Sequence, residues 1–83
     1  MRFRVERVIE LRGDVTVFVR TLDEGDFILS ETPRLGGIEI RRQVLQPRAL
    51  TGEGKPDLTI FAFQLVTASD HRRLSDGQTV DLA

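Results

Sequence analysis

Two stretches of alternating apolar and polar residues meet at a glycine, and this arrangement constrains the fold more than any other feature of the chain. The alternation runs through residues 3–11 and again through residues 15–19, on either side of Gly13. A period of two is typical of strands with one face buried, and glycine permits the positive φ of a tight hairpin turn. The pattern therefore predicts a β-hairpin. A shift in its phase at Val8-Ile9 indicates a bulge or a bend in the first strand.

A second turn signal follows the hairpin. Residues 23–26 are polar and contain the glycine that a tight turn favours, and they lead into a short third strand over residues 27–29. Residues 32–37 contain a proline and paired glycines, which are typical of a loop.

The middle of the chain predicts two further strands. The first begins at Ile38 and continues through residues 44–45, until Pro47 ends it or places it at a sheet edge. Residues 51–56, with two glycines, a proline and no apolar residue, are expected to be the most mobile segment. Residues 57–67 give the longest predicted strand, and apolar residues on both of its faces indicate a central strand covered on two sides.

The last part of the chain predicts a turn and one more strand. Residues 69–77 are typical of a turn or of one helical turn, with Ser69 or Asp70 as its N-cap. Val80 and Leu82 then form a last short strand.

These segments amount to about six strands without a sustained apolar stripe of helical period. The predicted fold class is all-β, a small six-stranded closed or partly open β-barrel, with a two-sheet sandwich as the alternative. At 83 residues, the chain is expected to form a single domain over residues 1–83.

The absence of cysteine excludes disulfide bonds and thiolate metal sites. Stability must come from apolar packing, backbone pairing or assembly with another chain. The first residues are charged, unlike a signal peptide, and no apolar run approaches the roughly 20 residues of a membrane span. We expect a soluble cytoplasmic protein that does not act at a membrane.

Residues near both ends of the chain follow a recognisable spacing. The first is Val5-Glu6-x-Val8-x-x-Leu11-x-Gly13, followed by the valine-rich strand, Arg20 and Gly25. It resembles the opening of the second-domain β-barrel of elongation factor Tu and related translation GTPases. Leu74-x-x-Gly77-x-x-Val80-x-Leu82 is similar to the closing strand of the same barrel.

The resemblance implies a barrel of the translation-factor second-domain type, which in that family contacts the acceptor end of aminoacyl-tRNA or ribosomal RNA. Val19 stands where the family has the glycine of a Gly-Arg pair, and residues 34–56 have no evident counterpart. The chain has no P-loop motif, so the GTPase domain is missing. No individual binding residue of the family is carried over.

The basic residues are the first candidates for a binding site. The net charge of −1 argues against a sequence-independent nucleic-acid binder, which usually carries a basic excess. Arginine nevertheless suits bidentate recognition of phosphate or carboxylate, and Arg34, Arg41, Arg42 and Arg48 form the densest basic group. Because neighbouring side chains on a strand diverge, at most one of Arg41 and Arg42 joins a patch with Arg48. The alternative is that these arginines pair with acidic neighbours.

Phe18 is the best candidate for an exposed or interface-facing aromatic residue, because it falls on the polar phase of its strand. The chain has five phenylalanines and no tyrosine or tryptophan, and Phe61 and Phe63 are expected in the core. Stacking with unpaired bases requires an exposed aromatic ring. In a barrel covered on both sides, Phe18 would be buried instead.

Catalytic and metal-binding groups are sparse. His71 lies between Asp70 and two arginines, close to Ser69 and Ser75, but adjacent residues of a turn point apart and do not form a triad. The acidic residues of the turn at residues 23–26 lack the full ligand set of a calcium loop, so a plain acidic turn is the preferred interpretation. We predict no catalytic residues, no metal and no cofactor.

Two functions remain open, beside the remote option of an enzyme that uses an arginine and His71. The first is a non-catalytic binding module whose partner is RNA, a ribonucleoprotein or another protein. The alternative is a structural or self-assembling protein, a homo-oligomer in which a strand edge or the Phe18 face pairs with a second copy.

Overall fold

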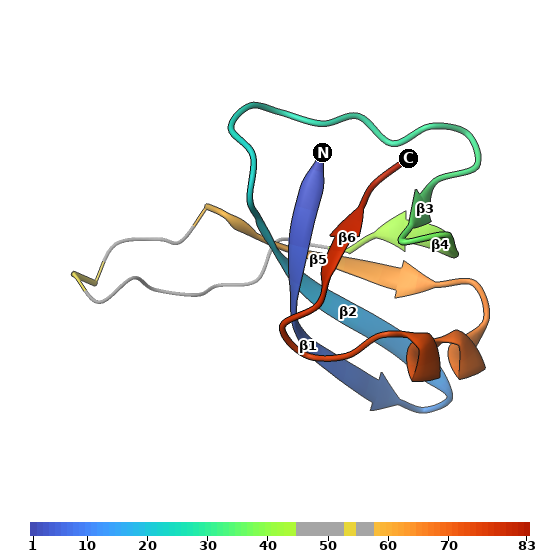
Figure 1. The fold of residues 1–83 in the computed structure, drawn as a ribbon. Coiled ribbons are helices and arrows are strands. Elements are labelled where there is room, and N and C mark those ends of the chain that lie inside the picture. Colours follow the sequence, from blue (N-terminus) through green and yellow to red (C-terminus); the bar gives the residue numbers. More distant parts are fainter. Residues whose placement is uncertain (45–52, 55–57) are drawn as a thin grey trace.

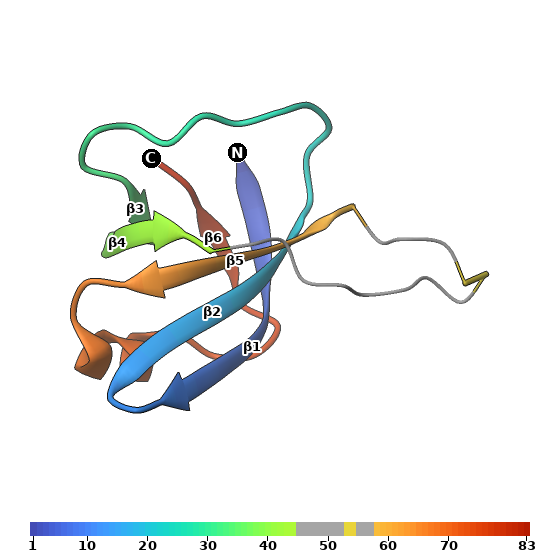
Figure 2. The same ribbon diagram turned by 180° about the vertical axis from the view of Figure 1, so that it is seen from behind.

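The computed structural model describes residues 1–44, 53–54 and 58–83, which form an all-β fold with one short helix (Figures 1 and 2). All strand pairs among these residues are antiparallel. The elements are β1 (Arg2–Leu11), β2 (Asp14–Thr21), β3 (Arg34–Leu35), β4 (Ile38–Gln43), β5 (Ile60–Leu65), the 3-10 helix η1 (Ala68–Arg73) and β6 (Thr79–Asp81). The predicted all-β class is confirmed.

The strands follow the order β3-β4-β5-β2-β1-β6, and the two ends of this order meet to form a nearly closed barrel. Arg34 in β3 and Ala83 after β6 exchange two backbone hydrogen bonds, with N···O distances of 3.1 and 2.8 Å. The Gly36 N–H donates to the Asp81 carbonyl at 2.8 Å. Figures 1 and 2 both show the C-terminus beside β3. The fold is therefore the predicted barrel and not the two-sheet sandwich.

The predicted hairpin is formed by β1 and β2, which are joined by the two-residue turn Arg12-Gly13. Both turn residues have positive φ, 53° and 83° respectively. This backbone matches the right-handed twist of paired strands, and glycine adopts it without steric cost.

The predicted irregularity in β1 is confirmed, but it lies at Glu6 instead of Val8-Ile9. Glu6 is the extra residue between Val5 and Arg7, at the point where the register with β2 shifts. Val8 is the first inward-facing residue after this bulge. The phase of the sequence pattern therefore changes two residues after the bulge itself.

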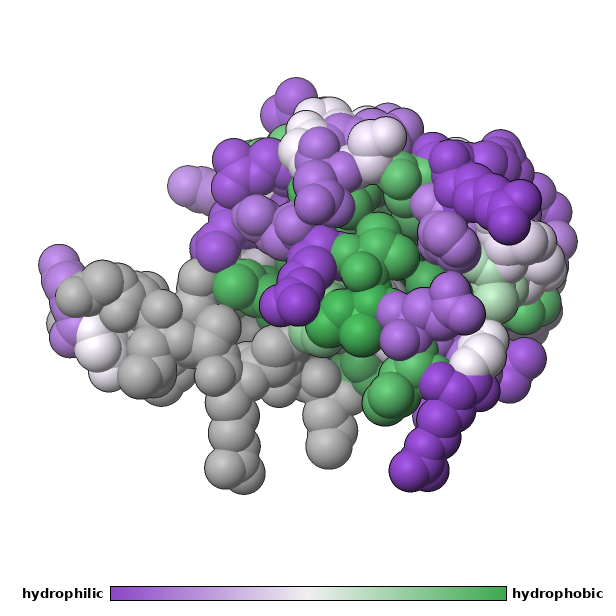
Figure 3. All heavy atoms as spheres, turned by 90° about the horizontal axis from the view of Figure 1, so that it is seen from below, coloured by the Kyte–Doolittle hydropathy of each residue, from purple (hydrophilic) through white to green (hydrophobic). Residues whose placement is uncertain are grey.

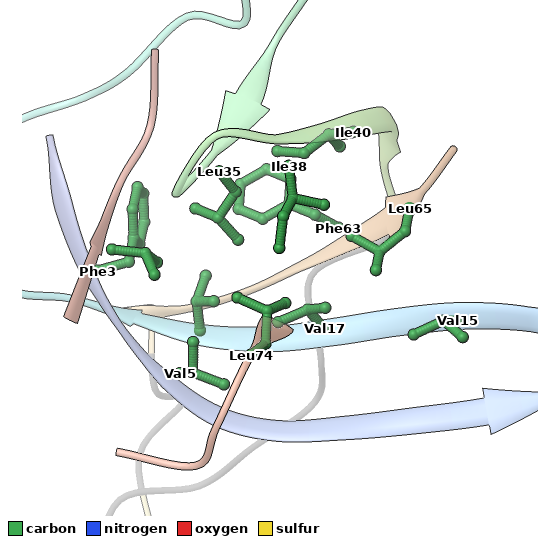
Figure 4. Close-up of a cluster of buried hydrophobic side chains, with 12 residues drawn as sticks. Phe3, Val5, Val15, Val17, Leu35, Ile38, Ile40, Phe63, Leu65 and Leu74 are labelled. Atoms are coloured by element: carbon green, nitrogen blue, oxygen red, sulfur yellow. The ribbon is translucent and has the colours of Figure 1, made fainter. Parts of the chain in front are cut away.

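The core fills the barrel with side chains from all six strands and from the segment after η1 (Figure 4). Its most deeply buried large side chains are Phe3, Phe63, Leu35, Ile38, Val5, Val15, Val17 and Val19. An aromatic cluster lies at one end of this core, where the Phe27 ring meets those of Phe3 and Phe61 edge to face, at centroid distances of 5.4 and 4.9 Å. Such edge-to-face pairs stabilise a core beyond the area that they bury.

The prediction of a strand over residues 27–29 is wrong. The segment is not paired in the sheet, although its side chains do alternate: Phe27 and Leu29 pack against the core and Ile28 is 94% exposed. The alternation thus reflects an extended connection that crosses one end of the barrel. Its inward side chains cover the core, but its backbone joins no ladder.

The third strand lies instead within residues 32–37, which the sequence predicted as a loop. Leu35 is fully buried in β3, and Gly36-Gly37 form a tight turn with φ of 60° and 81° into β4. The paired glycines therefore mark a second hairpin. β3 has two residues, which is too short for any periodic signal.

β5 is shorter than predicted, because it has six residues and β1, with ten, is the longest strand. Its expected central position is confirmed, since β5 lies between β4 and β2. Both faces of β5 are also buried. Phe63 and Leu65 point into the core, and Ala62 and Gln64 on the other face are buried as well.

The predicted helical turn is η1, and the predicted N-cap is wrong. The N-cap residue is Thr67, not Ser69 or Asp70, and no side chain caps the helix. η1 contacts β2 and β5, and its Ala68 packs against the core. The expectations for Pro47 and for residues 51–56 fall outside the described residues, apart from Glu53 and Gly54.

We expect Gly36→Ala to destabilise the protein more than Gly13→Ala. Both glycines have positive φ, and neither alanine variant can adopt that backbone without strain of about 1 kcal/mol. A Cβ at residue 36 would also lie 2.9 Å from Cγ1 of Val80, whereas a Cβ at residue 13 meets nothing within 4 Å. Overpacking adds about 2 kcal/mol at residue 36. Urea unfolding of both variants measures the difference in the free energy of unfolding. Equal losses of that free energy would contradict the close packing of the turn against β6.

Candidate binding surface

The backbone register places Phe18 on the outside of the barrel. Val17 and Val19, its neighbours in β2, are fully buried, so the side chain between them points away from the core. Phe18 lies opposite Arg7 in β1 and Ala62 in β5. Its side chain is half-buried. The sequence prediction of an outward-facing aromatic residue is therefore confirmed in direction, and the ring keeps part of its surface exposed.

Arg42 shares this outer side of the sheet. It is paired with Gln64 in β5, and its Nε donates a hydrogen bond of 2.9 Å to Gln64 Oε1. Gln64 is in turn paired with Thr16 in β2. Arg42 therefore lies two strand spacings, about 10 Å, to one side of β2. Its guanidinium is held in place by a neutral partner and not by a carboxylate.

We call this part of the barrel the outer face. Its centre is apolar and its margin carries arginines. Figure 3 shows hydrophobic residues gathered in the middle of the side seen from below, with strongly hydrophilic residues above them and to their right. The register and burial assign to it Arg7, Ile9, Thr16, Phe18, Arg20, Arg42, Ala62 and Gln64.

Glu6 neutralises one corner of the outer face. Its Oε1 accepts hydrogen bonds of 2.8 Å from both Arg4 and Arg20. These bonds, the one from Arg4 foremost, hold the pKa of Glu6 below its usual range. Arg20 also donates to Thr59 Oγ1 at 2.8 Å. Because its donors are engaged in this way, Arg20 is positioned to support the sheet rather than to meet a ligand.

Arg7 and Arg42 differ from Arg20 in their partners. Within the described part of the chain, neither forms an ion pair with a carboxylate. Both side chains belong to exposed residues. They therefore place uncompensated positive charge on two sides of Phe18.

The other predicted basic residues lie elsewhere. Arg34 and Arg41 line a shallow hollow of about 220 Å³ together with Glu31 and Glu39. The Arg34 guanidinium is 3.5 Å from the Glu39 carboxylate. The two arginines and the two glutamates nearly balance the charge of this hollow. This agrees with the alternative prediction that the arginines pair with acidic neighbours. Arg48 lies outside the described residues, so the structure does not place it.

A second hollow, of about 410 Å³, is lined by the acidic turn at residues 23–26 and by Leu58 and Phe61. Asp23 in this turn accepts hydrogen bonds from the Arg2 backbone N–H at 2.7 Å and from its guanidinium at 2.8 Å. The side-chain bond with Arg2 is the main cause of the lowered pKa of Asp23. The turn is thus tied to β1 by its own ion pair. No group of three or more acidic, histidine or cysteine side chains within residues 1–44, 53–54 and 58–83 is placed to hold a metal ion.

His71 lies in η1 and is half-buried. Its backbone carbonyl accepts the Leu74 N–H at 3.0 Å and so closes the end of the helix. The neighbouring Asp70 uses its backbone N–H in a bond to the Thr67 carbonyl at 3.1 Å. These contacts give the segment a structural role at the end of the barrel.

Sequence reasoning missed Arg7 as a member of the outer face. The bulge at Glu6 inverts the alternation of β1, and Arg7 then stands opposite Phe18. The change of phase near Val8 was the available signal. Reading the strand backwards from the turn at Arg12-Gly13 would have placed Arg7, Ile9 and Leu11 on one side.

Comparisons of the chain with models of protein families, with curated proteins and with solved structures found no match. In the described ranges, no helix has the length and hydrophobicity that crossing a membrane requires.

We expect Glu6→Gln to lower the free energy of unfolding by about 0.5 kcal/mol at neutral pH, because water screens this partly exposed ion pair. The folded-state pKa of Glu6 is lowered, so its contribution is present above the unfolded value of about 4.3 and is lost as the pH falls through the folded value. The difference between wild type and variant should therefore shrink below about pH 4.3. Denaturant unfolding at a series of pH values measures it. Glu24→Gln, at an exposed position, serves as the control. If the difference in the free energy of unfolding between wild type and Glu6→Gln persisted in acid, the ionised Glu6 carboxylate would not be its source.

Proposed function

We propose that the protein is a non-catalytic binding module of the cytoplasm, and that its outer face binds single-stranded RNA, free or within a ribonucleoprotein. The observation that carries the proposal is Phe18, a half-buried ring pointing outward directly opposite Arg7. Exposed aromatic rings on a sheet stack with unpaired bases, and arginines beside them bind the phosphates.

The arrangement of the outer face suits such a ligand. Arg7 and Arg42 lie on either side of Phe18, and both lack a carboxylate partner in the described residues. Thr16, a half-buried residue of β2 opposite Gln64, offers a hydroxyl group for base edges. The resemblance to the second-domain barrel of translation GTPases, whose partner is RNA, points to the same class of ligand.

The net charge of −1 determines how strongly the affinity for RNA should depend on salt. A protein without basic excess gains little from long-range attraction to a polyanion, so affinity must come from local contacts. Two arginine–phosphate contacts to a single strand give a slope of log K against log salt of about −1.4, since each contact contributes about −0.7. Binding should therefore depend weakly on salt.

We expect Phe18→Leu to weaken RNA binding about tenfold, because base stacking on an aromatic ring is worth about 1–3 kcal/mol. Leucine keeps the apolar character of the position without the ring. Fluorescence anisotropy with a labelled single-stranded RNA and with bulk tRNA measures the affinity. Thermal unfolding checks that the barrel is intact. Absence of binding by the wild-type protein at tens of micromolar would overturn the RNA proposal.

Arg42→Gln and Arg41→Gln form a matched pair for the salt dependence. The two residues are neighbours in β4 and lose the same charge, but Arg42 lies on the outer face and Arg41 lines the hollow with Glu31 and Glu39. We expect Arg42→Gln to reduce the magnitude of the salt slope by about 0.7. Arg41→Gln should leave the slope unchanged. Equal effects of the two variants would show that the outer face is not the binding surface.

A further inference from the structure

One edge of the barrel wall lacks a partner strand. β6 pairs with β1 over Arg2, Phe3 and Arg4, and the last contact on this side is at Val5, which exchanges backbone hydrogen bonds of 2.8 and 2.7 Å with the segment before β6. From Glu6 to the end of β1, β2 is the one described strand beside it. Figure 1 shows β1 continuing past β6 toward its hairpin turn.

The hairpin geometry identifies the free backbone groups on this edge. In a two-residue hairpin, the residues that flank the turn form a hydrogen-bonded pair, here Leu11 with Asp14. Hydrogen-bonded pairs then alternate, so Ile9 also bonds to β2 and the groups of Val8 and Glu10 point away from it. No other residue in the described part of the chain bonds to these groups. Their N–H and C=O groups are therefore available to another strand.

The free part of β1 carries the charged residues Glu6, Arg7 and Glu10, but it also presents large apolar side chains that a free edge strand usually lacks. Natural sheets protect such edges with charged residues, and β4 follows that rule with Arg41, Arg42 and Gln43, all exposed. On the free part of β1, Ile9 is half-buried and Leu11 is 69% exposed. Both lie on the outer side of the sheet. An edge of this kind favours pairing with a strand of similar character.

We propose that the free edge of β1 pairs antiparallel with the same edge of a second copy of the chain, so that the protein is a two-fold symmetric dimer. Two-fold contacts are self-complementary and close upon themselves, which limits assembly to two copies. The inference does not depend on the proposed RNA binding.

The charges along the edge exclude several registers, and centring on Leu11 would set Glu10 and Ile9 opposite the turn residues Arg12 and Gly13, which lie outside the strand. Residues directly opposite each other in an antiparallel pair point to the same face, so a symmetric pair is centred on a residue facing its own copy. Centring on Arg7 or Glu10 places like charges opposite each other, and centring on Val8 places Glu6 opposite Glu10. Like charges directly opposite are destabilising. Centring on Ile9 avoids all of these pairs.

The Ile9-centred register also satisfies the free backbone groups. Val8 of each copy then lies opposite Glu10 of the other, and each such pair exchanges both backbone hydrogen bonds. Ile9 meets Ile9 on the outer side, and Leu11 lies beside the aliphatic part of Arg7. The two sheets would continue into each other across the contact.

A single cysteine tests this register directly, because the native chain has none. Across the proposed contact, the two residues at position 9 form a non-hydrogen-bonded pair with Cα atoms about 4.5 Å apart, within the range of a disulfide. Ile9→Cys should therefore form a disulfide-linked dimer under mild oxidation. Leu11→Cys is the matched control, because the two copies of residue 11 would lie about 13 Å apart along the strands and could not be bridged.

Sedimentation velocity of the wild-type chain, from low to high micromolar concentration and without RNA, gives the oligomeric state. We expect a dimer, and we expect Ile9→Lys to be monomeric because it places two ammonium groups opposite each other. Ile28→Lys makes the same change at a residue that is 94% exposed and away from the edge, and it should remain dimeric. Circular dichroism confirms that both variants are folded. A wild-type monomer at every concentration, or cross-linking of Leu11→Cys as efficient as that of Ile9→Cys, would overturn the proposal.

Discussion

β2 lies in the middle of the sheet, and its backbone pairing with β1 on one side and β5 on the other decides which side chains fill the barrel. A shift of one residue in this register would turn Val17 and Val19 outward and Phe18 inward. The alternating burial of the strand, with fully buried valines and a half-buried Phe18 between them, is therefore the constraint on which both the core and the outer face depend.

A small barrel without disulfides must protect its core at the ends as well as along its wall. The connection between β2 and β3 does this at one end, where Phe27 packs edge to face against Phe3 and Phe61. The wall itself is closed by backbone bonds between β3 and the residues after β6. The close approach of the Gly36 turn to Val80 allows this closure. The turn at Gly36 thus closes the barrel both by packing against Val80 and by backbone pairing with the end of the chain.

Sequence periodicity predicted the parts of the fold that are long and half-buried. It gave the hairpin, the outward direction of Phe18 and the central position of β5, because each depends on alternation over several residues. β3 was missed, since two residues carry no period and its pairing with the chain end is made by backbone groups. The strand expected over residues 27–29 was wrong because alternation also arises in an extended segment whose side chains pack but whose backbone is unpaired.

The candidate site was predictable to a lesser extent. Phe18 and Arg42 were named from the sequence, but their position on one face depends on the pairing of β2 with β5 and of β5 with β4. Arg7 was hidden by the bulge at Glu6, and the shift of register at Arg41 separates that arginine from its neighbour Arg42. A bulge adds one residue to a strand and reverses which face the following side chains occupy. The alternation of apolar and polar residues therefore cannot predict the face beyond a bulge whose position is unknown.

The central claim is that a nucleic-acid ligand contacts the outer face of the sheet. Backbone amide chemical shifts, followed by NMR during titration with a single-stranded RNA, test it residue by residue. The account predicts changes concentrated at Arg7, Phe18, Arg42 and Gln64, with little change at the balanced hollow around Glu39. Changes concentrated at that hollow, or no changes at saturating RNA, would contradict it.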